Sequence, residues 1–305
     1  MSDNILITDN LTKRYGDKNA ANKINIHVKK GEIYGLIGRN GAGKTTILKM
    51  LSGLSTPTEG SYSILGKTGK ELDSVRAKVG ALIENPGIYP SMSAYENLKL
   101  KCIAMDRNED EYINELLSLV GLQDTGKKAA KNFSMGMKQR LGIALALIGD
   151  PEIIILDEPI NGLDPQGIAA MRDILKTLSK EKGLTIIISS HILEELAKIA
   201  DAYGIIHDGK LLVELTAEEL EEKCGEYTVL KTDNNEKAAD ILEQFGITDF
   251  SRIDDETIHI KVKMNNKGKI IQELVISGVD IREIAEKRIT LEQYYFDLTG
   301  GRNNV

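Results

Sequence analysis

The chain has 305 residues, 41% of them hydrophobic, which is enough to fill the core of one large domain or of a large and a small one. Its net charge of −7 disfavours a general nucleic-acid coat, and no nucleic-acid partner is expected. Cys102 and Cys224 lie far apart outside any metal-ligand pattern, so a disulfide framework or zinc site is not expected. No apolar run approaches the ~18 residues that cross a bilayer, and no export signal begins the chain, which favours a cytoplasmic location.

Short β-branched runs alternate with helical patterns through residues 1–214. Strands are expected at 24–28, 32–38, 79–84, 152–159, 184–191, 203–207 and 211–215. Because several of these runs are apolar throughout, they predict a mostly parallel sheet covered by helices. The sequence therefore predicts an α/β domain over residues 1–214.

A helical insertion is expected within this domain, at about residues 91–150. Between positions 91 and 130 the apolar residues return at helical spacing without a strand. Ser93 and Glu96 form the S-x-x-E capping box that begins the first of these helices, expected at 94–105.

Residues 215–305 begin a new pattern and predict a small α+β accessory domain. Strands are expected at 226–232, 257–263 and 279–286, and helices at 235–245, 268–277 and 291–300. This order favours a split-βαβ arrangement. Nothing in its residues assigns the domain a role.

The stretch GRNGAGKTT contains a phosphate-binding motif, G-x-x-x-x-G-K-[ST], between an expected strand and an expected helix at 45–54. Backbone N–H groups of such a loop surround a phosphate chain, its lysine reaches the β- and γ-phosphates, and its hydroxyl ligates Mg²⁺. The alternative is a glycine-rich turn with an incidental lysine. The residues expected to bind nucleotide are Gly38, Asn40, Gly41, Gly43, Lys44, Thr45 and Thr46.

An acidic pair follows a buried strand in IIILDEP. Asp157 is expected to hold Mg²⁺ through water, together with Thr45, and Glu158 to orient or deprotonate the attacking water. An acidic pair after apolar residues is also a common end of a strand. With the phosphate-binding loop upstream, the pair predicts nucleotide hydrolysis.

The stretch NFSMGMKQRLGIALAL places a short turn, from Ser134 to Gly136, before a helix. At this point the chain resembles the ATP-binding subunits of ABC transporters, and the resemblance spans residues 4–214. It implies that the nucleotide is ATP with Mg²⁺. It also implies that Ser134 and Gly136 contact the γ-phosphate of ATP bound by a second copy of the chain.

Three further residues occur in the order that this family shows. The resemblance implies that Tyr15 in LTKRYG stacks on adenine and that Asp164 in NGLD lies in a loop crossing the dimer interface. It also implies that His191 in IISSH contacts the γ-phosphate. Singly, such a tyrosine is as often a turn residue, and such a histidine is more often a loop or core residue. Order and spacing favour the functional interpretation.

Two positions depart from the commoner family pattern. The signature Leu-Ser-Gly-Gly-Gln reads FSMGM at 133–137, which keeps the serine and the second glycine. Glu84, in LIENPGIYP, stands where most members have a glutamine that touches Mg²⁺ and the attacking water. Glu84 is expected either to ligate the metal or to point away until a partner docks. Together with the stretches FSMGMKQR and LEQYYFDLTGG, Glu84 makes the chain resemble the peptide-antibiotic branch of the family. This branch comprises bacitracin-resistance and lantibiotic-immunity subunits.

The resemblance implies a homodimer that encloses two ATP molecules and drives integral-membrane permeases from the cytoplasmic face of the membrane. The candidate docking surface comprises Ile88, Tyr89, Met92 and Tyr95, with packing of the insertion on the core as the alternative. A soluble ABC-type ATPase of DNA repair or translation is the alternative function. The intact site motifs disfavour a third possibility, a catalytically idle binding module.

Overall fold

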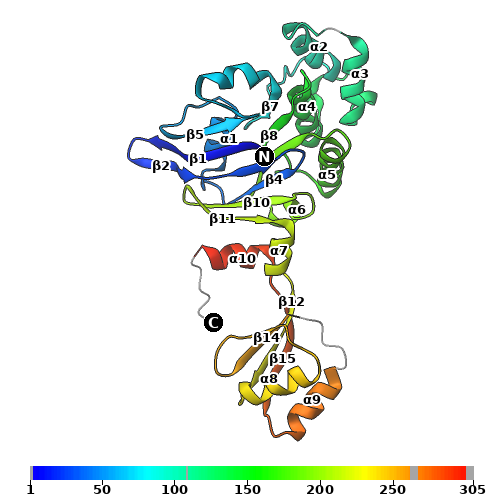
Figure 1. Ribbon diagram of the computed structural model, residues 1–305. Helices are drawn as coiled ribbons and strands as arrows, with labels where there is room; N and C mark the ends of the chain where they lie inside the picture. Colours follow the sequence, from blue (N-terminus) through cyan, green and yellow to red (C-terminus); the bar gives the residue numbers. More distant parts are fainter. Residues whose placement is uncertain (1–2, 108, 262–266, 300–305) are drawn as a thin grey trace. The chain divides into compact units, whose positions relative to one another are not determined.

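The computed structural model describes residues 3–107, 109–261 and 267–299. The chain divides into two compact units, Met1–Ala217 and Glu218–Val305, each of which is visible in Figure 1. The division lies close to the predicted one after residue 214. No helix among the described residues combines the length and the apolarity needed to cross a bilayer.

A six-stranded sheet forms the centre of the first unit, in the order β11-β10-β4-β9-β8-β7. Every neighbouring pair is parallel except β10 and β11, so the predicted mostly parallel sheet is confirmed. Its strands are β4 (Ile33–Ile37), β7 (Val79–Leu82), β8 (Ile153–Asp157), β9 (Thr185–Ser190), β10 (Ala202–His207) and β11 (Lys210–Thr216). Strands β4, β8 and β9 are buried along their whole length, while β7 closes one edge.

A second, antiparallel sheet of the same unit was not predicted. It comprises β1 (Asn4–Tyr15), β2 (Lys18–Ile24), β3 (His27–Lys29), β5 (Glu59–Ile64) and β6 (Lys67–Thr68). The expected strand at 24–28 is divided between the end of β2 and the start of β3. Register shifts interrupt the pairing of β1 with β2, β3 and β5, and they hide the alternation by which a half-buried strand is recognised.

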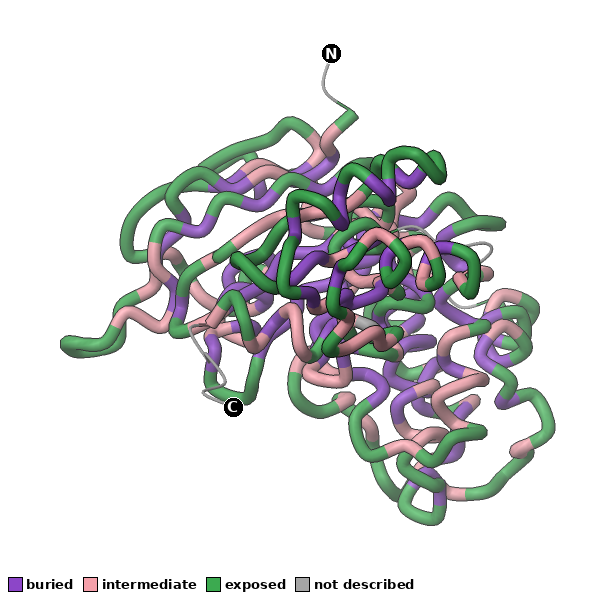
Figure 2. The backbone as a smooth tube through the Cα atoms, turned by 90° about the horizontal axis from the view of Figure 1, so that it is seen from below, coloured by how far each residue is buried: buried purple, intermediate pink, exposed green. Residues whose placement is uncertain are grey.

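Helix α1 (Lys44–Leu51) lies in the core that both sheets share. Its buried Ile47, Leu48 and Met50 belong to one apolar cluster with Leu6 of β1 and Ile155 of β8. Burying each such side chain contributes about 1.5–3 kcal/mol. The buried residues are purple in Figure 2. The first turn of α1 is therefore held in place from both sides.

The insertion forms α2 (Ala94–Ala104), α3 (Asp110–Leu119) and α4 (Met135–Leu147), and α2 and α3 lie together at the top of Figure 1. The predicted capping box is present: the Ser93 hydroxyl accepts from the Glu96 N–H, and the Glu96 carboxylate accepts from the Ser93 N–H. The remaining helical segments of the unit are the 3₁₀ helices η1 (Gly69–Lys78), η2 (Gln123–Thr125) and η3 (Ala130–Asn132), and α5 (Pro165–Lys180) and α6 (Leu193–Leu196).

The second unit contains an antiparallel four-stranded sheet in the order β13-β14-β12-β15. Its elements are β12 (Glu226–Thr232), α8 (Asn235–Gln244), β13 (Phe250–Arg252), β14 (Thr257–Ile260), α9 (Lys267–Ile276) and β15 (Ile281–Arg288). Helix α7 (Ala217–Lys223) precedes them and α10 (Leu291–Leu298) follows. This βαββαβ order is the split-βαβ arrangement that the sequence favoured, with β13 as an additional short strand. Of the strand expected at 257–263, residues 262–263 lie outside the described residues, as does residue 300 of the last expected helix.

Candidate nucleotide-binding site

The predicted phosphate-binding loop connects β4 to α1, and close packing requires glycine at two of its positions. A Cβ on Gly38 would lie 2.6 Å from the Ile206 carbonyl oxygen. A Cβ on Gly43 would lie 2.3 Å from that of Ala20, and Gly43 also has a left-handed φ of 110°. The loop thus leads tightly into α1, whose first N–H groups are free to bind an anion.

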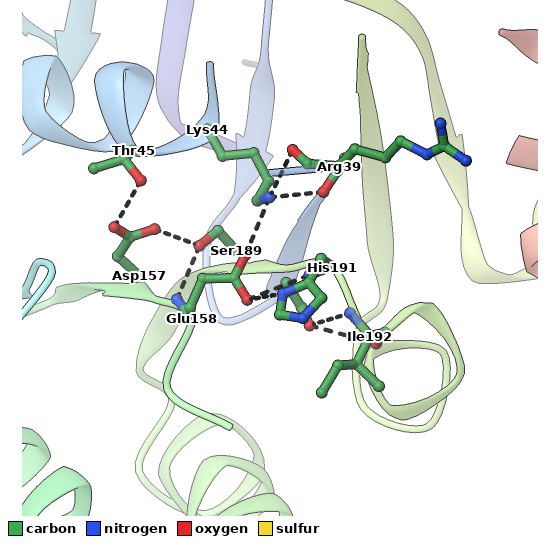
Figure 3. Close-up of polar contacts among 10 residues, drawn as sticks. Arg39, Lys44, Thr45, Asp157, Glu158, Ser189, His191 and Ile192 are labelled. Carbon is green, nitrogen blue, oxygen red and sulfur yellow. Dashed lines mark hydrogen bonds and ion pairs between the residues drawn. The ribbon is translucent and has the colours of Figure 1, made fainter. Parts of the chain in front are cut away.

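Lys44 begins α1 and points back into the loop (Figure 3). Its side chain is only 5% exposed, and its Nζ donates to the carbonyl oxygens of Gly38 (2.6 Å) and Arg39 (3.3 Å). The same nitrogen forms an ion pair with Glu158, at 3.0 Å from Oε1. A buried ammonium group is thus fixed where the loop would enclose phosphate.

Thr45 and Asp157 meet at the carboxyl end of β8. The Thr45 hydroxyl donates to Asp157 Oδ2 over 2.8 Å, and the Ser189 hydroxyl donates to Asp157 Oδ1 over 2.7 Å. Ser189 Oγ also accepts from the Glu158 N–H, at 2.9 Å. Ser189 is fully buried and lies opposite Asp157 in the β8–β9 pairing, so a single hydroxyl orients both members of the acidic pair.

Sequence analysis missed Ser189. The available signal was its place at the end of a buried parallel strand, beside the strand that ends in Asp157. Only the register of the two strands brings the two residues together.

Substituting Ser189→Ala is expected to lower the free energy of unfolding by about 1–3 kcal/mol, because two buried polar groups lose their partner. ATP turnover should fall as well, because Asp157 and Glu158 lose orientation. Denaturant titration and an ATPase assay measure the two effects. Ser190→Ala is the matched control, since the equally buried Ser190 contacts the backbone of Ile192. Equal losses of turnover in both variants would contradict the role of Ser189.

Glu158 and His191 form the other half of the cluster. Glu158 has a left-handed φ of 51°, which turns its side chain from the end of β8 towards Lys44 and His191. His191 Nδ1 lies 2.7 Å from Glu158 Oε2. Because an ionised carboxylate only accepts, Nδ1 carries the proton. Oε1 of Glu158 is buried and, within the part of the chain that the structure describes, has no hydrogen-bond donor, since Lys44 approaches it closely but without hydrogen-bond geometry.

Comparisons with known proteins agree with this geometry. The sequence model of the ABC transporter family matches residues 21–161. The bacitracin transport ATP-binding protein BcrA of Enterococcus faecalis is 44% identical to this chain, over 97% of each protein. The chain belongs to the ABC transporter ATP-binding proteins. The lantibiotic transport ATP-binding protein SrtF of Streptococcus pyogenes is 45% identical, over 69% of this chain and 90% of SrtF.

Solved ABC ATPases share the fold. The protein cbiO1 from Clostridium perfringens, part of the ABC transporter complex cbiONQ, superimposes with a TM-score of 0.66 at 29% identity, over 72% of this chain and 91% of that one. A dimeric ATP-binding cassette bound to ADP and phosphate gives a TM-score of 0.63 at 27% identity, over 70% and 98% of the chains. The protein is therefore an ATP-binding and ATP-hydrolysing subunit of an ABC transporter, and the soluble alternative is not favoured.

The other residues that the family resemblance singled out in this ABC ATPase are Tyr15, Ser134, Gly136 and Asp164. Tyr15 ends β1 and is 54% exposed. Ser134 caps α4, and Asp164 caps α5 by accepting from the Gly167 N–H. A Cβ on Gly136 would lie 3.6 Å from the Leu163 side chain, so the signature turn packs beside the NGLD loop. The roles of these residues stay predictions.

Glu84 of the ABC ATPase contacts α1 through Lys49. Lys49 Nζ donates to Glu84 Oε1 over 2.6 Å. This hydrogen bond raises the pKa of the Lys49 ammonium group. Lys49 was not singled out in the sequence, although it follows Thr45 by one helical turn.

Proposed function

We propose that this ABC ATPase powers a separate integral-membrane permease that exports a peptide antibiotic, and so confers immunity or resistance. The observation that carries the proposal is the 44% identity to a bacitracin transport ATP-binding protein. That match extends over 97% of the chain and so includes the second unit. In this arrangement the protein lies at the cytoplasmic face of the membrane, bound to the permease.

The oxygen groups at the carboxyl end of β8 suit Mg²⁺, a hard cation that takes few protein ligands and several from phosphates and water. Thr45 and Asp157 would hold it, and the buried Oε1 of the adjacent Glu158 has no hydrogen-bond partner among the described residues. Bound Mg²⁺ would neutralise charge on the β- and γ-phosphates.

Hydrolysis would use the two halves of the cluster in sequence. Lys44 would exchange Glu158 for the β- and γ-phosphates of ATP, because a phosphate chain offers it more negative charge. Glu158, released, would accept a proton from the attacking water while the water oxygen bonds to the γ-phosphorus and ADP leaves. His191, held by Glu158 through Nδ1, would direct Nε2 to the γ-phosphate.

Two copies of the chain would enclose two ATP molecules. Ser134, Gly136 and the N-terminus of α4 would face the γ-phosphate bound by the second copy, where the helix dipole favours an anion. Met135 is 53% exposed beside these residues, so it would be covered on dimerisation.

A groove of about 490 Å³ next to Glu84 is the proposed docking place for the permease. Tyr89 (54% exposed) and Leu54 (66% exposed) line it, together with Leu100 of α2. Of the surface predicted from sequence, only Tyr89 lines the groove, while the Tyr95 hydroxyl donates to Asp110. An apolar helix of the permease fits such a groove.

Substituting Tyr89→Asp is expected to abolish co-purification with a multi-span membrane protein while leaving ATP binding by the isolated chain intact. Tagged protein pulled from detergent-solubilised membranes of the source cells measures the first, and fluorescent ATP titration the second. Ile103→Asp is the control, since Ile103 is equally exposed (55%) but does not line the groove.

Deleting the gene should also increase killing by bacitracin or by a lantibiotic, and the wild-type gene should reverse the effect where the Tyr89→Asp gene does not. Unchanged susceptibility to both antibiotics, with no membrane protein recovered, would contradict the proposed function.

A further inference from the structure

Asp157 ends β8, and Glu84 follows the end of the neighbouring strand β7 at the same edge of the sheet. Strand β7 pairs with β8 in parallel, with Leu82 opposite Leu156. Asp157 follows Leu156 directly, and Glu84 follows Leu82 by two residues. Two carboxylates are thus delivered to one edge, where they repel each other unless a cation lies between them.

Lys49 supplies such a cation. It follows Thr45 by four residues on α1, so the two side chains lie on one face of the helix, one turn apart. Thr45 is hydrogen-bonded to Asp157 and Lys49 to Glu84. Asp157 acts electrostatically on Lys49 as well. One face of α1 therefore presents a hydroxyl to one carboxylate and an ammonium to the other.

The backbone at Glu84 adds a second observation. Its φ of 62° is left-handed, a conformation that costs a glutamate energy and persists only when other contacts hold it. The 2.6 Å bond to Lys49 is the side-chain contact that fixes this turn to α1. Since the Glu84 side chain is 58% exposed, the turn is otherwise open to rearrangement.

We propose that Lys49 is a positioning residue that competes with Mg²⁺ for Glu84. It holds the loop after β7 against α1, and metal bound one helical turn away at Thr45 and Asp157 attracts the same carboxylate and repels the ammonium. This inference rests on the proposed magnesium site. Glu84 then reports metal and nucleotide binding to the loop, which continues into the groove through Asn85 and Pro86.

The test compares Lys49→Met with the wild-type chain in two measurements. The free Mg²⁺ concentration for half-maximal ATP hydrolysis is expected to fall about threefold, as for the loss of a partly exposed ion pair. Hydrogen exchange of the amides in 82–90, measured without Mg²⁺ or nucleotide, is expected to become faster. Lys99→Met is the control, because it breaks the similarly exposed pair of Lys99 on α2 with Asp110 on α3 and should change neither value.

The Glu84→Gln background separates competition from a general charge effect. There Lys49→Met is expected to shift the Mg²⁺ midpoint less than in the wild-type background, because the carboxylate competed for is gone and only the direct charge effect of Lys49 on the Asp157 site remains. An equal shift in that background would overturn the proposal, since Lys49 would then act on Asp157 directly. A Mg²⁺ midpoint that stays at the wild-type value in the single variant would overturn it as well.

A second variant and a measurement without metal cover the cases in which Lys49→Met or the ATPase assay fails. If Lys49→Met does not fold, Lys49→Gln removes the charge with a polar side chain and carries the same expectations. Wild-type protein without Mg²⁺-dependent ATPase activity would contradict the proposed function instead. The hydrogen-exchange measurement needs neither metal nor nucleotide, so it still tests the role of Lys49 in that case. If exchange at 82–90 does not respond to loss of Lys49, the proposal that Lys49 holds this loop against α1 is wrong.

Discussion

Glu158→Gln should bind ATP and remain dimeric with it, yet hydrolyse it ~10²–10⁴-fold more slowly, the usual contribution of a positioned general base. Glutamine preserves the shape of the side chain but cannot accept the proton of water. It also removes the charge that pairs with Lys44 and His191, so ATP affinity should not fall. Single-turnover hydrolysis and ATP titration of the purified chain measure the two quantities.

Glu152→Gln provides the control for this prediction. Glu152 lies just before the opposite end of β8 and pairs with Lys30 and Lys78 at the surface, so turnover should stay at the wild-type level. Normal turnover in Glu158→Gln would remove Glu158 from the role of base.

Lys44→Met should weaken ATP binding by about thirtyfold or more, the effect of truncating one partner of a buried charge contact, ~2–5 kcal/mol. Methionine keeps the apolar stem but loses the ammonium that two loop carbonyl groups and Glu158 now surround. Equilibrium titration with a fluorescent ATP analogue measures the change. Lys30→Met removes an exposed ammonium from the same unit and should bind ATP normally. Comparable affinities in the two variants would argue against phosphate contact by Lys44.

The central sheet could be predicted because its strands are continuous apolar runs. Segments such as Ile153–Asp157 are buried from end to end, and burial on both faces requires that composition. The antiparallel sheet could not be predicted in the same way. Asn10 in β1 and Lys23 in β2 have left-handed φ values of 47° and 52°, so the inward and outward positions change phase within a strand.

The residues of the site likewise fall into those that the sequence predicted and those that only the fold reveals. Lys44, Thr45, Asp157 and Glu158 carry motifs whose spacing along the chain is itself diagnostic, and the structure brings them together with His191. Ser189 and Lys49 act through strand register and helix periodicity, so their partners are distant in sequence. Ser134, Gly136 and Asp164 lie elsewhere on the unit, and a second copy of the chain is needed to test them.

The place of β7 in the sheet has a mechanical consequence. Strand β8 is flanked by two neighbours, so Asp157 and Glu158 stand on a stiff support. Strand β7 has four residues and, within the described sheet, pairs only with β8, so displacing its end strains a single hydrogen-bonded ladder. The catalytic carboxylates thus follow a strand that is held on both sides, while Glu84 follows an edge strand that is held on one side only in the described sheet. A small force transmitted through Tyr89 would displace the end of β7 and Glu84 without disturbing the groups that cleave ATP.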